Sequence, residues 1–86
     1  MITNGWTAVG LTATPIDGVH NQPARLTIHN NDNATNIYLG GPNVTITNGL
    51  LLRKEESYQF VLNPLEQIYA VSDRLGHVVS WMRQPL

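Results

Sequence analysis

The chain has 86 residues, 13% of them charged, with no cysteine and a formal net charge of −1. Chains of this length hold one hydrophobic core, so we expect a single domain over residues 1–86. The lack of cysteine excludes disulfides and thiolate metal sites, and the near-neutral charge argues against binding to nucleic acid or to an anionic membrane. A small core without these supports favours stabilisation by partner subunits.

The first half of the chain predicts three β-strands, because apolar and polar residues alternate with a period of two. The expected strands cover residues 6–12, 24–30 and 35–40. The segment 13–23 between the first two contains several proline and glycine residues, which predict a long loop. Short polar residues at 31–33 predict a turn, because Asx side chains bond the local backbone.

The second half predicts three more strands, over residues 57–62, 67–72 and 77–82, with a turn at 73–76. Residues 44–47 are expected to form a short strand or a strand-like arm before the tight-turn signal Asn48-Gly49. Residues 50–56 are too few for a stable helix, so we expect a charged connection at the edge of the sheet. Six or seven short strands separated by turns predict an all-β fold, a small antiparallel β-sandwich or barrel, with flexible arms at 1–5 and 83–86.

No group of residues in the sequence predicts catalysis or metal binding. His20, His29 and His77 lack a metal-ligand spacing, although three imidazoles could hold zinc if the fold brought them together. Glu55 and Glu56 are adjacent in a charged segment, where both are expected to be solvated rather than to form an acid–base pair. No nucleophile motif and no phosphate-binding loop is present. We therefore expect a protein that is not an enzyme and that has no metal and no cofactor.

Seven residues are candidates for contact with a partner. Trp6 and Trp81 could each anchor a protein interface or stack on a sugar ring, or could instead close the two ends of the core. Arg53 and Lys54 belong to a charge cluster that could blunt an exposed strand edge or contact a neighbouring subunit. The remaining three lie in the long loop or in the C-terminal arm, segments that could order on contact: Asp17, His20 and Arg83.

Three stretches within residues 25–81 together form a recognisable sequence pattern. They are Asn-Ile-Tyr-Leu-Gly-Gly-Pro-Asn-Val-Thr from Asn36, Asn-Gly-Leu-Leu-Leu from Asn48, and Gln-Ile-Tyr-Ala-Val-Ser from Gln67. This pattern resembles that of small β-rich structural proteins of tailed bacteriophages. The resemblance implies a virion protein, either a capsid decoration (cement) protein or a module of a tail or fibre. Glu55 stands where the phage pattern commonly has glycine, which implies a different turn geometry there.

Our leading hypothesis is a capsid decoration protein that binds the major capsid protein, stabilises the head shell and forms a homo-oligomer, with a trimer favoured. One alternative is a tail or fibre module that recognises a host-surface carbohydrate through an exposed tryptophan. A cupin-like metal enzyme built on the three histidines is a third hypothesis, which we do not favour. The expected location is the capsid surface of the virion, after synthesis in the host cytoplasm, because the sequence starts without a signal-peptide pattern and has no bilayer-spanning apolar run.

Overall fold

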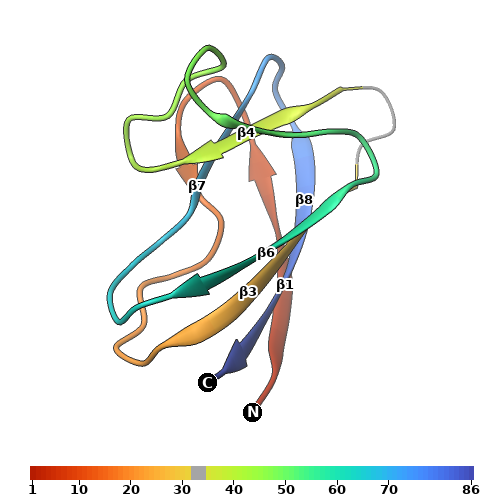
Figure 1. Ribbon diagram of the computed structural model, residues 1–86. Helices are drawn as coiled ribbons and strands as arrows, with labels where there is room; N and C mark the ends of the chain where they lie inside the picture. The colour runs from red at the N-terminus through yellow and green to blue at the C-terminus, as the bar shows by residue number, and fades with distance from the viewer. Residues whose placement is uncertain (32–34) are drawn as a thin grey trace.

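Eight β-strands form two antiparallel sheets in the computed structural model, which describes residues 1–31 and 35–86 (Figure 1). The first sheet has the order β1-β8-β3-β6, and the second has the order β2-β7-β4-β5. No helix in the described part of the chain is long and apolar enough to cross a membrane. The strands are β1 Thr3–Val9, β2 Thr14–Pro15, β3 Ala24–Asn30, β4 Ile37–Gly40, β5 Leu50–Leu52, β6 Ser57–Leu62, β7 Tyr69–Ser72 and β8 His77–Pro85.

The chain crosses from one sheet to the other after almost every strand. Among the described strands, only β4 and β5 follow each other within one sheet, as a hairpin. Eight strands in this order form a double Greek-key jelly roll, in which two sheets pack face to face. The two termini lie side by side at one end of the first sheet, because Thr3 pairs with Arg83 (Figure 1). The predicted all-β class and the antiparallel sandwich are confirmed.

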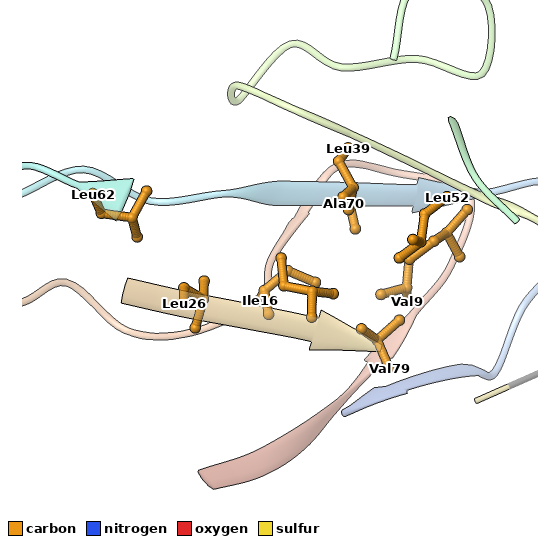
Figure 2. Packing of buried hydrophobic residues seen from close by; sticks show 10 residues of the cluster. Val9, Ile16, Leu26, Leu39, Leu52, Leu62, Ala70 and Val79 are labelled. Carbon is orange, nitrogen blue, oxygen red and sulfur yellow. The ribbon is translucent and has the colours of Figure 1, made fainter. Parts of the chain in front are cut away.

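The core lies between the two sheets, where their inward-facing side chains meet. In β3, Leu26 and Ile28 are fully buried, while Thr27 between them points outward. Burying one such aliphatic side chain contributes about 1.5–3 kcal/mol to stability. Tyr58 and Phe60 of β6 pack partly buried against this cluster, with their ring centroids 6.3 Å apart. Figure 2 shows the inward side chains of both sheets, among them Val9, Ile16, Leu26, Leu39, Leu52, Leu62, Ala70 and Val79.

Two crossing connections, at 53–56 and 63–66, use the same turn. In each, the N–H of the fourth residue donates to the carbonyl of the first. The fourth residue is a glutamate whose carboxylate accepts the N–H of the first residue. The third residue, Glu55 at φ 62° or Leu65 at φ 70°, lies in the left-handed region that glycine favours. Glu55 therefore adopts a backbone conformation that glycine accommodates with less strain than glutamate.

The terminal segments 1–5 and 83–86 differ from the flexible arms that the sequence predicted. The first strand starts at Thr3 and ends at Val9, and the last strand continues to Pro85. These ends pair with each other, with Asn4 opposite Met82. The sequence did not reveal this pairing because Asn4 and Gly5 are poor strand formers, and a neighbouring strand must hold them extended.

The segment 13–23 is only partly the long loop that the sequence predicted. Thr14 and Pro15 form β2 at the edge of the second sheet, opposite Ala70 and Tyr69. An edge is the position where a strand tolerates proline, since the missing N–H can face solvent. Ile16 follows with its side chain in the core, and its N–H donates to the carbonyl of Ile68 at 2.9 Å. The rest of the segment contains no strand.

The segment 44–52 also differs from its prediction. Residues 44–47 are not a strand, because Thr45 starts a turn in which its carbonyl accepts the N–H groups of Asn48 and Gly49. The leucines expected in a charged connection form β5 and pair with β4. The Asn48 side chain stabilises this turn, because its Oδ1 accepts the Thr45 N–H at 2.8 Å. The turn predicted at 31–33 lies partly outside the described residues.

Candidate interaction surface

One face of the first sheet points away from the core, and we call it the outer face. It consists of alternate residues of four strands, because successive side chains of a strand point to opposite sides. Arg25 is the one formally charged residue among them. The outer face contains Asn4, Trp6, Ala8, Arg25, Thr27, His29, Ser57, Gln59, Val61, Val78, Ser80, Met82 and Gln84.

Trp6 is the most exposed large apolar residue of the outer face, with 68% of its surface accessible. It pairs across the sheet with Ser80, so its diagonal neighbours on β8 are Val78 and Met82, which are also exposed. A tryptophan flanked by aliphatic groups is the kind of feature that dominates the binding energy of protein interfaces. The alternation of the strand already indicated Val78 and Met82 in the sequence, because both lie on the side opposite to Val79.

Four polar residues of the outer face are hydrogen-bonded in two pairs across β3 and β6. His29 Nδ1 lies 2.7 Å from the hydroxyl of Ser57, and Gln59 Nε2 donates to the hydroxyl of Thr27 at 3.3 Å. Side chains held in this way need little ordering when a partner binds. Because they carry almost no charge, their desolvation costs less than that of a charged surface. The outer face is therefore suited to broad contact with another protein.

Trp81 lies on the opposite side of the same sheet from Trp6. Its indole packs against the core, and its Nε1–H is buried without a hydrogen-bond partner in the described structure. Gly5 is its direct partner on β1, and a Cβ at Gly5 would come within 2.9 Å of the ring atom Cζ2. The indole therefore requires glycine at position 5. Trp81 closes the core, so the structure corrects its selection as a surface residue.

Asp17, His20 and Arg83 come together at the end of the sandwich where the termini lie. Arg83 is 7% exposed, and its Nε–H donates to Asp17 Oδ2 at 2.7 Å. His20 Nε2 lies 3.4 Å from the same oxygen, and the Gly18 N–H donates to the other one at 2.7 Å. His20 and Arg83 also line a hollow of about 250 Å³. The Asp17–Arg83 pair ties the β2–β3 segment to β8, so its first role is structural.

Arg53 and Lys54 lie at the other end of β3, in the exposed turn between β5 and β6. The Lys54 N–H donates to Asn36 Oδ1 at 3.2 Å, and the neighbouring Glu55 N–H donates to the carbonyl of Asn30. This turn is therefore anchored to both sheets through its backbone, while the basic side chains stay in solvent. The structure does not bring Arg53 or Lys54 together with the other candidates.

His77 is at the centre of a buried polar network between the sheets. The Asn30 amide donates through Nδ2 to the carbonyls of Thr35 and Leu52, each at 3.2 Å. Its Oδ1 is left as an acceptor for the Nε2–H of His77 at 2.7 Å. The single lone pair of His77 Nδ1 is then the acceptor that the hydroxyls of Ser72 and Thr35 share, each at 3.0 Å. Burial lowers the pKa of His77, and the charge of Arg74 acts in the same direction while Asp73 opposes it.

Ser72, His77 and Asn30 include the residue types of a catalytic nucleophile, a base and an orienting group. All three side chains are buried, so a substrate has no path to the Ser72 hydroxyl. The three histidines also lie in separate places, with His20 at one end, His29 on the outer face and His77 inside. Within residues 1–31 and 35–86, no cluster of three metal-ligating side chains occurs. The network links β3, β7 and β8, so its role is structural.

No protein-family model matches the chain. No curated protein sequence matches it either. A solved structure of a protein from Bacillus endospore appendages, described as a novel family of disulfide-linked pili, has a similar fold. The TM-score is 0.61 with 11% sequence identity, and the match covers 100% of this chain and 86% of that one. At this identity the likeness shows the fold alone.

Proposed function

We propose that this domain is a structural protein that binds other proteins through the outer face of its first sheet. The observation that carries the proposal is Trp6, exposed together with Val78 and Met82 on a regular, nearly uncharged sheet surface. Most of the Trp6 indole lies in solvent, so its contribution to the stability of the domain is small. Its exposure is explained if a partner covers it.

The partner that we propose is the major capsid protein of a tailed bacteriophage, with this domain as a decoration protein on the head shell. The sequence pattern around Asn36 and Gln67 supports the phage assignment. The similar fold of a protein from spore pili supports a role in a protein assembly in general terms. Repeated copies on a symmetric shell would act together, so each contact can be small. Under this proposal the protein is not an enzyme, it acts as a homo-oligomer, with a trimer favoured, and it is located on the virion surface.

The direct test is binding of the purified domain to heads that lack it. Heads of a phage deleted for this gene are incubated with micromolar protein and sedimented, and bound protein is quantified. We expect saturable binding and a higher temperature of head disruption. Trp6→Ala should weaken binding about thirtyfold or more, because truncating a tryptophan that anchors an interface costs at least about 2 kcal/mol.

A matched control is Leu65→Ala. Leu65 is 67% exposed, close to the value for Trp6, but it lies in the turn at 63–66 and outside the outer face. This variant should bind like the wild type. Equal loss from both substitutions, or no binding of the wild type, would contradict the proposal.

A second candidate function is recognition of a host-surface carbohydrate by a tail or fibre module. Trp6 favours it too, because an exposed indole is a stacking surface for a sugar ring and Asn4 and Ser80 lie beside it. Trp81 no longer supports this hypothesis, since its indole packs in the core. A glycan array probed with wild type, Trp6→Phe and Trp6→Ala distinguishes the two functions. Carbohydrate binding should survive Trp6→Phe in part and disappear with Trp6→Ala, whereas a decoration protein should bind no glycan.

A further inference from the structure

The first sheet ends in two edge strands, β1 on one side and β6 on the other. The hydrogen bonds at the ends of β3 reveal which backbone groups these edges leave open. The Leu86 N–H donates to the Pro23 carbonyl, and the Asn30 N–H donates to the Glu56 carbonyl. In an antiparallel ladder every second residue bonds to a given neighbour. Odd residues of β3 therefore bond to β8, and even residues of β3 bond to β6.

The same alternation extends to the two edges. Odd residues of β1 bond to β8, so Asn4, Trp6 and Ala8 direct their N–H and C=O groups toward the free edge. The next even residue supports this, since the Gly10 carbonyl turns away from β8 and accepts the Ser72 N–H. On β6 the corresponding free groups belong to odd residues, Ser57, Gln59 and Val61. Nothing in the described part of the chain bonds to these edge groups.

The two edges are complementary because the number of strands in the sheet is even. β1 and β6 run in opposite directions, so a copy placed beside another would pair them antiparallel. In the register with the most pairs, Asn4, Trp6 and Ala8 lie opposite Val61, Gln59 and Ser57. All six side chains point to the outer face. The pairing therefore places the outer faces of the two copies side by side, and their core-facing sides likewise.

The side chains of the two edge strands favour this junction. Trp6 and Val61 are the most exposed large apolar residues of the first sheet, at 68% and 62%, and one stands on each edge. In the register above, they become diagonal neighbours across the junction. Neither strand contains a charged residue or a proline, the features with which proteins normally block an edge. The edges of the second sheet differ, because β2 has two residues including Pro15 and β5 has three.

We propose that copies of this chain associate head to tail, with β1 of one copy paired to β6 of the next. The contact is heterologous, so it builds a closed ring or an open row of subunits. The two strands have seven and six residues, so the interface is small. The association is therefore weak and changes with concentration in the measured range. The outer face stays open along the joined sheet, so self-pairing is compatible with the shell binding proposed above, and Trp6 takes part in both contacts.

Two proline variants test the pairing. Ala8→Pro removes a free N–H from β1, and Gln59→Pro removes one from β6, while neither removes a bond inside the sheet. Sedimentation velocity of the wild type from 10 μM to 1 mM (~100-fold in concentration) should show a mass that rises with concentration. Each variant alone should have an association constant lower by several-fold to about tenfold, because one N–H···O bond at the junction is lost and such a bond contributes about 0.5–1.5 kcal/mol. An equal mixture of the two should form mainly dimers, because the intact β1 of Gln59→Pro pairs with the intact β6 of Ala8→Pro and only weakened edges remain.

Ala8→Val and Gln59→Val are the matched controls, since they change the side chain and keep the N–H. Both should associate like the wild type. A wild type that stays monomeric at the highest concentration would overturn the proposal. So would dimerisation of Gln59→Pro alone at wild-type strength, because that result indicates pairing of β1 with β1.

A charge exchange tests the register even if a proline variant fails to fold. Ala8 and Ser57 lie on opposite edges of one chain but face each other across the proposed junction. The double variant Ala8→Lys with Ser57→Lys should associate several-fold more weakly at low salt, because like charges directly opposite repel. Ala8→Lys with Ser57→Glu should restore association. Equal association of both double variants would rule out this register.

Discussion

The two faces of the first sheet carry the same kinds of residue in opposite circumstances. The inner face has Trp81, His77 and Arg83, which are packed, bonded or ion-paired with the rest of the protein. The outer face has Trp6, His29 and Arg25, which the fold does not use for the contact between its sheets. The chemistry of a residue therefore does not decide its role here. Its place in the alternation of a strand does, and this contrast makes the outer face the candidate for function.

The tryptophans provide the sharpest test of this contrast. Trp81→Ala should lower the free energy of unfolding by about 3–5 kcal/mol, because it leaves a cavity under the first sheet. Trp6→Ala should lower it by less than about 1 kcal/mol, since the side chain is already exposed. Urea unfolding followed by circular dichroism measures both. Losses of similar size would remove the distinction between the two faces.

The arginines test the same contrast with charge. Arg83→Ala should cost about 2–4 kcal/mol, because Asp17 loses its partner in a place that is nearly buried. Arg25→Ala should change stability by no more than about 0.5 kcal/mol. The double variant Asp17→Asn with Arg83→Ala measures the coupling, and it should be less harmful than the sum of the two single changes. Additive losses would mean that the ion pair contributes nothing of its own.

The histidines differ in how they should respond to pH. Burial lowers the pKa of His77 in the folded state, so below about pH 6.5 the unfolded chain takes up a proton more readily than the folded one. The stability contributed by neutral His77 is complete above that pH and is lost as the pH falls toward the folded pKa. The free energy of unfolding at pH 7.5 and 5.0 should therefore differ more in the wild type than in His77→Gln.

His29→Gln, on the outer face, is the control for this measurement and should retain the pH dependence that His77 causes. At pH 7.5, Asn30→Ala should cost about 1–3 kcal/mol, because the His77 Nε2–H loses its acceptor inside the core. A wild type and a His77→Gln variant with the same pH dependence would show that the network does not disfavour the charged imidazole.

The smallest expected effect concerns a residue that belongs to neither face. Glu55→Gly should raise the free energy of unfolding by about 1 kcal/mol, because glycine occupies the left-handed region without the strain of a side chain. Lys54→Gly, at the preceding position of the same turn, should not stabilise the protein. Thermal unfolding of both variants decides this, and a destabilising Glu55→Gly would show that the glutamate side chain contributes more than its backbone conformation costs.

Much of the fold could be predicted from the sequence because the relevant signals are local. Alternation over 24–30 and 57–62 depends on neighbouring residues alone, and so do the turn signals at Asp73 and Pro64. The missed strands are those without an alternating pattern of their own. Asn4 and Gly5 are extended because β8 lies beside them, and Leu50 to Leu52 are extended because β4 does.

The candidate surface shows the same division. By itself, the sequence determined that Trp81 and Val79 share one side of a strand while Val78 and Met82 share the other, because side chains alternate. Only the tertiary structure decided which side is buried, since that depends on where the second sheet packs. It also decided that Asp17 meets Arg83, a contact between residues 66 positions apart. Such a contact has no local signal, because it arises from the path of the chain between the two sheets.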